Sequence, residues 1–201
     1  MLKLTAHGSR GSAVAAFFDM EPEPRGKNGG VTEPYRVMTV CTGNICRSPM
    51  AQVVLRERLD RAGLDGDVVG DSTGISDEEH GHPIDRRAAR VLTAHGYRVP
   101  SHSARRITRA DLAAADLVLA MTSAHARALR ALARDDAALA ARVRMYRSFD
   151  PDAPVDGPEH LLDVDDPWYG DATDFEVTLA EVEAAADGVV AHVREAVRRR
   201  R

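Results

Sequence analysis

The chain has 201 residues, of which 44% are hydrophobic, 29% charged and only 4% aromatic, and its formal net charge is −4. This size suits one domain with a largely aliphatic core. The negative charge argues against nucleic acid as a partner, and the lack of any run of roughly 18 apolar residues argues against a membrane span. The two cysteines, Cys41 and Cys46, form no disulfide framework and favour a reducing, cytoplasmic compartment.

The first 34 residues differ in composition from the rest of the chain. Residues 21–30 are rich in proline, glycine and charge, so they cannot bury enough apolar surface to offset the entropy of ordering. An apolar patch at residues 13–18 is too short for a secretory signal. We therefore predict a disordered extension over residues 1–34 and a folded domain over residues 35–201.

A short apolar run with β-branched residues at positions 37–40 predicts a buried strand, and a polar loop at positions 41–47 follows it. Ser48 is a candidate helix N-cap, and Pro49 suits the first helical position. Apolar residues then recur at helical spacing until Gly63, which should end the helix.

The same alternation continues to the end of the chain. Further strands are predicted at 67–70, 116–121 and 143–146, and helices at 85–95, at 123–132 with an extension towards 141, and at 174–197, with a long loop over 148–170. The arginines at positions 198–201 should complement the helix dipole and stay solvated. Strands alternating with helices predict a single-domain α/β fold, with a parallel four-stranded sheet covered by helices on both faces, a three-layer α/β/α arrangement.

The loop after the first strand carries the strongest chemical signal. Cys41 opens it, Arg47 follows six positions later, and a helix begins directly afterwards. Backbone N–H groups of such a loop form an anion nest, the helix N-terminus adds partial positive charge, and an arginine fork can hold two phosphate oxygens. The same field favours a thiolate at Cys41, which makes it a nucleophile facing a bound phosphate.

A zinc site is a poor alternative for the two cysteines, since their spacing is longer than usual and no second Cys/His pair completes four ligands. We expect no metal and no cofactor.

Transfer of a phosphoryl group from a phenol to sulfur also needs a proton donor for the departing oxygen. The long loop offers Asp163, Asp165 and Asp166. From the residues alone any of the three is a candidate, and a solvated acidic loop without catalytic function is the other interpretation.

Two segments together resemble one known family. Residues 40–49, V-C-T-G-N-I-C-R-S-P, are similar to the phosphate loop of the low-molecular-weight protein tyrosine phosphatases, and residues 166–170, D-P-W-Y-G, are similar to their general-acid loop. The resemblance extends over about residues 35–198 and includes the segments 71–74, 102–105 and 147–151. It implies a cytoplasmic protein-tyrosine phosphatase that acts on phosphotyrosine-containing proteins through a phosphocysteine intermediate. We expect a monomer or weak dimer.

By position, the resemblance implies that Cys41 is the nucleophile, that Arg47 clamps the phosphate, and that Asp166 is the acid and then the base. The expected phosphate and substrate contacts are Thr42, Gly43, Asn44, Ile45, Cys46, Ser48, Trp168 and Tyr169, and the expected supports of the loop are Ser72 and His102. Ser48 would also donate to the Cys41 thiolate. Cys46 has two interpretations: a reversible disulfide with Cys41 that protects the nucleophile from deeper oxidation, or a residue that only lines the loop.

One position departs from the family pattern: Glu78 stands where the family usually carries an aromatic wall of the cleft, which should disfavour acidic phosphopeptides.

Three other functions share features with this sequence. Thioredoxin-coupled arsenate reductases have this loop but need resolving cysteines outside it, and this chain has none. Protein-arginine phosphatases of this fold tend to carry threonine where this chain has Ile45. A phosphate-binding module without catalysis is disfavoured because Cys41, Arg47 and Asp166 are all present.

Overall fold

The computed structural model describes residues 33–154 and 156–201. Of the extension predicted over residues 1–34, all but the last two positions therefore lie outside the described residues. In the part of the chain that is described, no helix is both long and apolar enough to span a bilayer.

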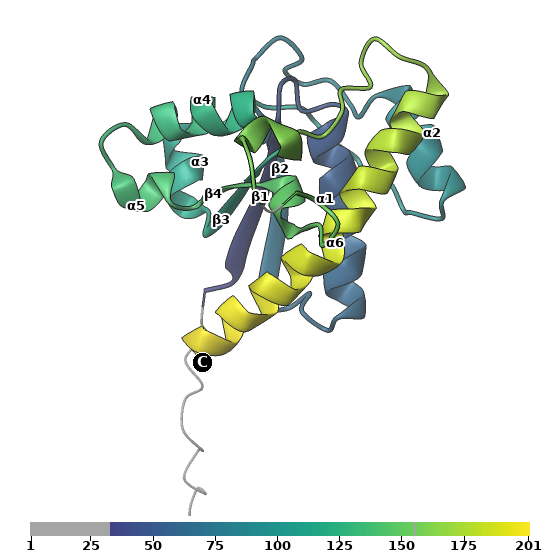
Figure 1. The fold of residues 1–201 in the computed structure, drawn as a ribbon. Coiled ribbons are helices and arrows are strands. Elements are labelled where there is room, and N and C mark those ends of the chain that lie inside the picture. Colours follow the sequence, from purple (N-terminus) through teal and green to yellow (C-terminus); the bar gives the residue numbers. More distant parts are fainter. Residues whose placement is uncertain (1–32, 155) are drawn as a thin grey trace, which may run out of the picture. The chain divides into compact units, whose positions relative to one another are not determined.

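Within these residues, four parallel strands form one sheet in the order β2-β1-β3-β4 (Figure 1). The strands are β1 (Tyr35–Cys41), β2 (Val68–Gly74), β3 (Leu117–Ala120) and β4 (Val143–Met145). The central β1 pairs with β2 along its whole length, up to Cys41 opposite Gly74, and with β3 from Val37 opposite Leu117. The strands run upward in Figure 1, so their carboxyl ends, where the site forms, lie at the top of the view.

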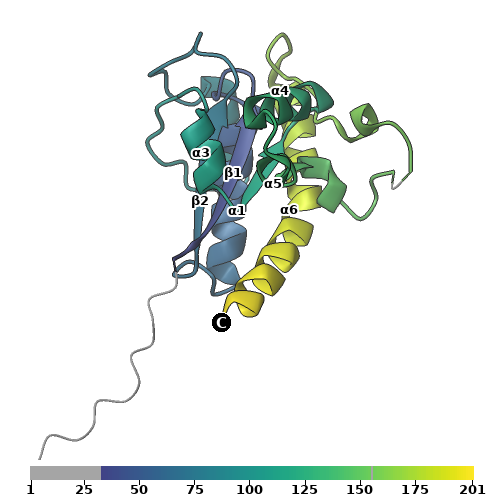
Figure 2. The same ribbon diagram turned by 90° about the vertical axis from the view of Figure 1, so that its left-hand side faces the viewer.

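Helices cover both faces of the sheet, as the two views show (Figures 1 and 2). One face carries α1 (Arg47–Arg61), α2 (Arg86–Ala94) and α6 (Ala172–Arg200), and the other carries α3 (Arg109–Ala114), α4 (Ser123–Ala133) and α5 (Ala137–Ala140). Side chains of β1 alternate between the two cores: Val37 and Cys41 face the α1/α6 side, and Met38 and Val40 face the α4 side. The predicted three-layer α/β/α fold is confirmed.

The start of α1 differs from the prediction. The helix begins at Arg47, and Cys46 occupies the N-cap position without a side-chain capping bond, so Ser48 is not the N-cap. Pro49 is the third helical residue rather than the first, which is tolerated because the N–H groups of the first turn have no intrahelical partner. The hydroxyl of Ser48 is thereby left for contacts inside the phosphate loop.

Other helices and strands differ from the prediction in their bounds, because the hydrophobic pattern does not mark their polar ends. Strand β2 continues through the polar residues 71–73 to Gly74, because they pair with the buried end of β1. The helix predicted at 123–132 is α4, but its extension towards 141 is interrupted at Arg134, whose φ is 56°, and the chain resumes as the separate helix α5. Helix α3 was not predicted; a capping box between Thr108 and Asp111 starts it.

The ends of the last helix are fixed by specific polar contacts. A capping box between Asp171 and Asp174 starts α6 two residues before the predicted position. The terminal arginines at positions 198–201 are exposed, as expected, and Arg200 in addition forms two hydrogen bonds with Asp116 and lies 4.6 Å from the centre of the Tyr35 ring. The predicted loop before α6 contains two short 3-10 helices, η1 (Tyr146–Phe149) and η2 (Glu159–Leu162).

Candidate active site

The loop Cys41–Arg47 connects the carboxyl end of β1 with the N-terminus of α1, so the anion nest and the helix end expected from the sequence face the same space. Cys41 is 3% exposed, and its Sγ lies 3.0 Å from the Ser48 hydroxyl. That hydroxyl also lies 3.2 Å from the carbonyl oxygen of Thr73. Its single proton goes preferentially to the sulfur when Cys41 is a thiolate, because an anion is the stronger acceptor.

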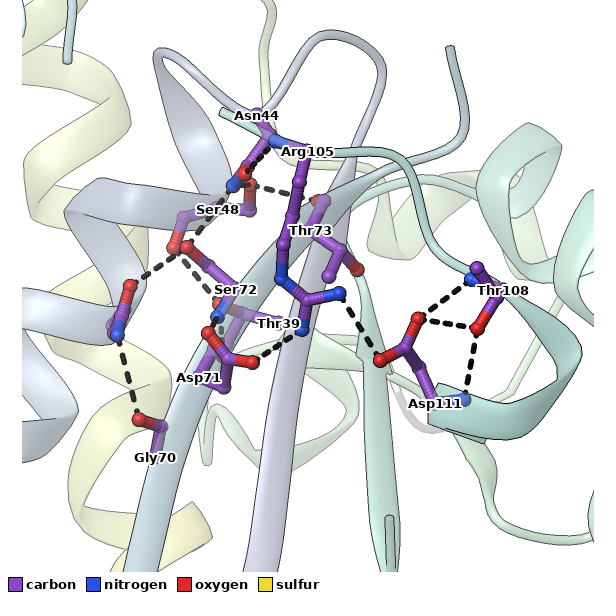
Figure 3. Close-up of polar contacts among 11 residues, drawn as sticks. Thr39, Asn44, Ser48, Gly70, Asp71, Ser72, Thr73, Arg105, Thr108 and Asp111 are labelled. Atoms are coloured by element: carbon purple, nitrogen blue, oxygen red, sulfur yellow. Dashed lines mark hydrogen bonds and ion pairs between the residues drawn. The ribbon is translucent and has the colours of Figure 1, made fainter. Parts of the chain in front are cut away.

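Asn44 shapes the loop. It is fully buried and has a φ of 61°, a left-handed conformation that costs a non-glycine residue free energy and needs support from its surroundings. Its side-chain amide donates to Ser48 Oγ and Ser72 Oγ at 3.0 Å each, and its Oδ1 accepts from the backbone N–H of Arg105 (Figure 3). His102 Nε2 donates to its carbonyl oxygen at 2.6 Å. The structure thus brings the two expected supports of the loop, Ser72 and His102, into contact with Asn44.

A second layer of contacts, not anticipated from the sequence, holds that network. The Arg105 guanidinium forms ion pairs with Asp71 on β2 and with Asp111 on α3 (Figure 3). Ser72 Oγ donates to Gln52 Oε1 of α1 at 2.7 Å. The bonds from Asn44 therefore end on residues whose side chains are themselves held by three different elements, β2, α3 and α1.

Thr42 is supported by a buried histidine that sequence reasoning missed. His125 is 3% exposed; its Nε2 lies 2.9 Å from Thr42 Oγ1, and its Nδ1 lies 2.9 Å from Thr122 Oγ1. Burial, together with the nearby positive charge of Arg47, lowers the pKa of His125 to about 4. The ring is therefore neutral near pH 7, with one nitrogen donating and the other accepting.

Arg47 joins the phosphate loop to the acidic loop before α6. Its side chain is almost fully buried, its Nη2 lies 2.7 Å from Asp166 Oδ2, and its Nη1 donates to the carbonyl oxygen of Val164 at 3.3 Å. The carboxyl group of Asp166 therefore stands beside the guanidinium expected to hold the phosphate.

The three candidate aspartates have different surroundings. Asp163 accepts hydrogen bonds from the backbone N–H and the hydroxyl of Ser123, at the N-terminus of α4. Asp165 is exposed, and its backbone N–H donates to Glu181. Only the carboxylate of Asp166 forms an ion pair with Arg47 among the described residues, and its other oxygen accepts from the backbone N–H of Trp168 at 3.2 Å. Geometry thus favours Asp166 where the residues alone left the choice open.

The rim of the site combines aromatic and acidic side chains. Trp168 is 38% and Tyr169 94% exposed on the acidic loop. On the opposite segment Glu78 is exposed, but it is its neighbour Glu79 that packs on the phosphate loop: a Cβ atom added to Gly43 would lie 2.9 Å from Glu79 Cγ. The Glu79 carboxylate pairs with His82 Nδ1 at 2.7 Å. Of these two glutamates, Glu79 is therefore the one whose side chain packs on the phosphate loop.

The remaining loop residues, Ile45 and Cys46, are both buried. The backbone oxygen of Ile45 accepts from the N–H of Asp85 at 2.8 Å. Burial, with a further contribution from the negative charge of Asp85, raises the pKa of the Cys46 thiol, so Cys46 stays protonated near neutral pH. Both cysteines are free thiols. Across the described ranges, no group of three or more His, Cys, Asp or Glu side chains could hold a metal ion.

Most of the chain is similar to one family of known proteins. The family model described as low molecular weight phosphotyrosine protein phosphatase matches residues 36–199. A low molecular weight protein-tyrosine-phosphatase of Streptomyces coelicolor is 47% identical, over 81% of this chain and 96% of the relative. Low molecular weight protein-tyrosine phosphatase A of Mycobacterium tuberculosis is 45% identical, over 79% and 91%. The crystal structure of a low molecular weight protein tyrosine phosphatase from T. tengcongensis is 30% identical and superimposes with a TM-score of 0.67, over 79% and 99%.

Proposed function

The chain belongs to the low-molecular-weight protein tyrosine phosphatase family, and we propose that it hydrolyses phosphotyrosine and aryl phosphates through a phosphocysteine intermediate on Cys41, with Asp166 as general acid and base. One observation carries the assignment of roles. The ion pair at 2.7 Å joins Asp166 to Arg47, and Arg47 ends the loop that begins with the buried Cys41.

In the first step, the loop N–H groups and Arg47 hold the non-bridging phosphate oxygens, and the Cys41 thiolate attacks phosphorus. The S–P bond forms as the P–O bond to the tyrosine ring breaks, and the electron pair of that bond goes to the phenolic oxygen. Protonated Asp166 gives its proton to this oxygen, so tyrosine leaves as a neutral phenol. Before this step the phosphate oxygens take the guanidinium of Arg47 from the Asp166 carboxylate, and the released carboxylate takes up the proton from solvent that it later gives to the phenolic oxygen.

In the second step, the Asp166 carboxylate takes a proton from a water molecule that attacks phosphorus. The S–P bond breaks, inorganic phosphate forms, and the electron pair returns to sulfur. The Ser48 hydroxyl, 3.0 Å from Cys41 Sγ, supports this role because it can donate to the departing thiolate. The thiolate is then ready for the next substrate.

Partner and compartment follow from the same chemistry. We propose phosphotyrosine-containing proteins as the substrates, and a reducing cytoplasmic compartment, since the nucleophile must stay a free thiol. Nucleic acid and membrane are not expected partners at a net charge of −4, and we propose a monomer or weak dimer. The buried lining residues Asn44, Ile45 and Cys46 would shape the nest, while Trp168 and Tyr169 would wall the substrate ring.

The intermediate can be observed directly. Acid quench during turnover of a phosphotyrosine peptide should place one phosphoryl group on the peptide that contains Cys41, seen by mass spectrometry. Cys41→Ser should abolish turnover yet retain phosphopeptide binding, whereas Cys46→Ser should still form the intermediate. A phosphoryl group on any other residue would overturn the mechanism. A higher kcat/KM for phosphoarginine than for phosphotyrosine peptides would overturn the choice of substrate.

A further inference from the structure

Two charged residues at the start of α2, Asp85 and Arg87, lie between the phosphate loop and the acid-bearing loop, and the mechanism above does not use them. The backbone N–H of Asp85 donates to the carbonyl oxygen of Ile45 at 2.8 Å, which fixes the start of α2 to the phosphate loop. The Asp85 side chain caps α2 by accepting from the backbone N–H of Arg87 at 2.7 Å. The start of α2, which carries Arg87, is therefore anchored to the phosphate loop.

The guanidinium of Arg87 reaches across to the other loop. Its Nε and Nη2 each donate to a carboxylate oxygen of Asp85 at 3.1 Å. Its Nη1 donates to the backbone oxygens of Trp168 and Gly170, at 3.2 and 2.9 Å. The planar fork thus has one side held by its own helix cap and the other bound to the loop that carries Asp166.

Aromatic rings enclose the same guanidinium. Its Cζ lies 5.7 Å from the centre of the Trp168 ring and 4.7 Å from that of Phe175, which is fully buried at the start of α6. These distances are those of cation–π contacts. Trp168 therefore packs on Arg87 while its neighbour Tyr169 stays exposed.

The acid loop is the segment before α6 that carries Asp166, and its tip, residues 167–170, has few other supports. Its remaining hydrogen bonds in the described part of the chain are local: the Gly170 N–H donates to Pro167 O, and the Trp168 N–H donates to the Asp166 carboxylate. Arg87 alone, among the described residues, supplies hydrogen bonds to this tip from another element.

The charges of this pair are stable over the working pH range. Burial by itself would raise the pKa of the Asp85 carboxyl, but the hydrogen bonds from Arg87 outweigh it and the net pKa is lowered. The bond to Asp85 raises the pKa of Arg87. Both groups therefore remain ionised when the acid has to deliver its proton.

We propose that Arg87, oriented by Asp85, is a positioning residue that holds the acid loop against the phosphate loop, so that Asp166 reaches the leaving oxygen. This proposal rests on the proposed role of Asp166 as general acid. Loss of the Arg87 side chain should weaken protonation of the leaving group without disturbing the binding of phosphate.

The test compares two leaving groups. Arg87→Met keeps the length of the side chain but removes its side-chain hydrogen bonds, and Arg86→Met, at an exposed neighbouring position, is the matched control. The readout is kcat/KM, which covers the steps up to phosphoryl transfer to Cys41. For phenyl phosphate, Arg87→Met should lower it by at least about tenfold, a share of the roughly 10²–10⁴-fold effect of general acid catalysis. For dinitrophenyl phosphate, whose leaving group needs no proton, the loss should stay within about threefold. Arg86→Met should change neither.

Asp166→Asn separates the two proposals. If the loss of kcat/KM in Asp166→Asn does not depend on the leaving group, the assignment of Asp166 as the acid fails. If Asp166→Asn shows this dependence but Arg87→Met lowers kcat/KM equally for both substrates, or for neither, the proposed positioning role of Arg87 is overturned. In the double variant, phenyl phosphate should be hydrolysed no more slowly than by Asp166→Asn alone, because both changes remove one function.

Competitive inhibition by inorganic phosphate should be unchanged in Arg87→Met, because the phosphate loop stays intact. A large loss of phosphate binding would assign Arg87 to that loop instead.

Discussion

The two loops that meet at Arg47 and Asp166 are built in opposite ways. In the phosphate loop, Cys41, Asn44, Arg47 and Ser48 are at most 5% exposed, and side chains or backbone groups of β2, α4 and residues 102–105 bond to it. In the acid loop, Trp168 and Tyr169 are 38% and 94% exposed, and one arginine holds its tip. A nest of N–H groups stabilises an anion only if it stays open and fixed, whereas the acid loop has to admit the ring of the substrate. Changes in the two loops should therefore have different kinetic signatures.

The largest effect in this comparison should come from Arg47→Lys. Lysine keeps the charge but loses the planar fork that holds two phosphate oxygens and reaches Asp166. We expect kcat/KM to fall by about 10²–10⁴-fold for every aryl phosphate, whatever its leaving group. A loss confined to poor leaving groups would mean that Arg47 serves the acid and not the phosphate.

Ser48→Ala should have a smaller effect, located in the second step. A hydrogen bond to a charged group contributes about 1.5–3 kcal/mol, so the departing thiolate should be destabilised and the rate of intermediate hydrolysis lowered by about 10–100-fold. Burst kinetics separate the two steps, and the phosphocysteine should accumulate. Ser103→Ala, at an exposed position of the neighbouring segment, is the control. Faster turnover of the intermediate in Ser48→Ala would contradict the role of this hydroxyl.

The buried His125 predicts a pH dependence of stability. Its folded pKa of about 4 lies below the value of about 6.5 for an unperturbed histidine, so the unfolded chain takes up the proton first. The stability that this difference contributes is present above pH 6.5 and is lost as the pH falls towards 4, with about 2 kcal/mol lost between pH 7 and 5.

Urea unfolding of the wild type and of His125→Gln measures this contribution, with His160→Gln at an exposed position as control. The stability difference between wild type and His125→Gln should shrink between pH 7 and 5, and that between wild type and His160→Gln should not. A constant difference for His125→Gln would show that the ring is not held neutral.

The smallest expected effect concerns the rim. Glu79 packs on Gly43 and carries a partly exposed carboxylate, so Glu79→Gln should raise kcat/KM for acidic phosphopeptides by only about two- to fivefold, and less at high salt. Glu78→Gln is the matched comparison, because Glu78 has the same charge one position away from the contact. An equal effect of both changes would show that the charge of the whole segment acts, and not the residue on the loop.

The sequence predicted the parts of the site that lie close together in the chain. The order of strand, loop and helix placed Cys41 and Arg47 correctly, since the hydrophobic pattern marks the strand end and the helix start. The same local reasoning failed at Ser48, because a serine before a helix predicts an N-cap. Its hydroxyl instead lies 3.0 Å from Cys41 Sγ, a contact that the family resemblance implied and the local pattern did not.

Supports that come from distant parts of the chain could not be found in this way. Thr42 and His125 are separated by 83 positions, and Arg87 and Gly170 also by 83, with no local pattern to link them. The choice among Asp163, Asp165 and Asp166 likewise depends on which carboxylate the fold brings to Arg47. Local patterns thus identified the chemistry, and tertiary packing decided which side chains carry it.

The most direct test of the mechanism is kcat/KM of Asp166→Asn for phenyl phosphate and dinitrophenyl phosphate across the pH range, beside Asp163→Asn and Asp165→Asn. Asp166→Asn should lose about 10²–10⁴-fold on phenyl phosphate and much less on dinitrophenyl phosphate, and its pH–rate profile should lack the basic limb that a general acid produces. Asp163→Asn and Asp165→Asn should keep the wild-type ratio of kcat/KM between the two substrates and the wild-type pH–rate profile. An equal loss of Asp166→Asn on both substrates, or a leaving-group dependence in Asp163→Asn or Asp165→Asn, would contradict the assignment of the proton donor.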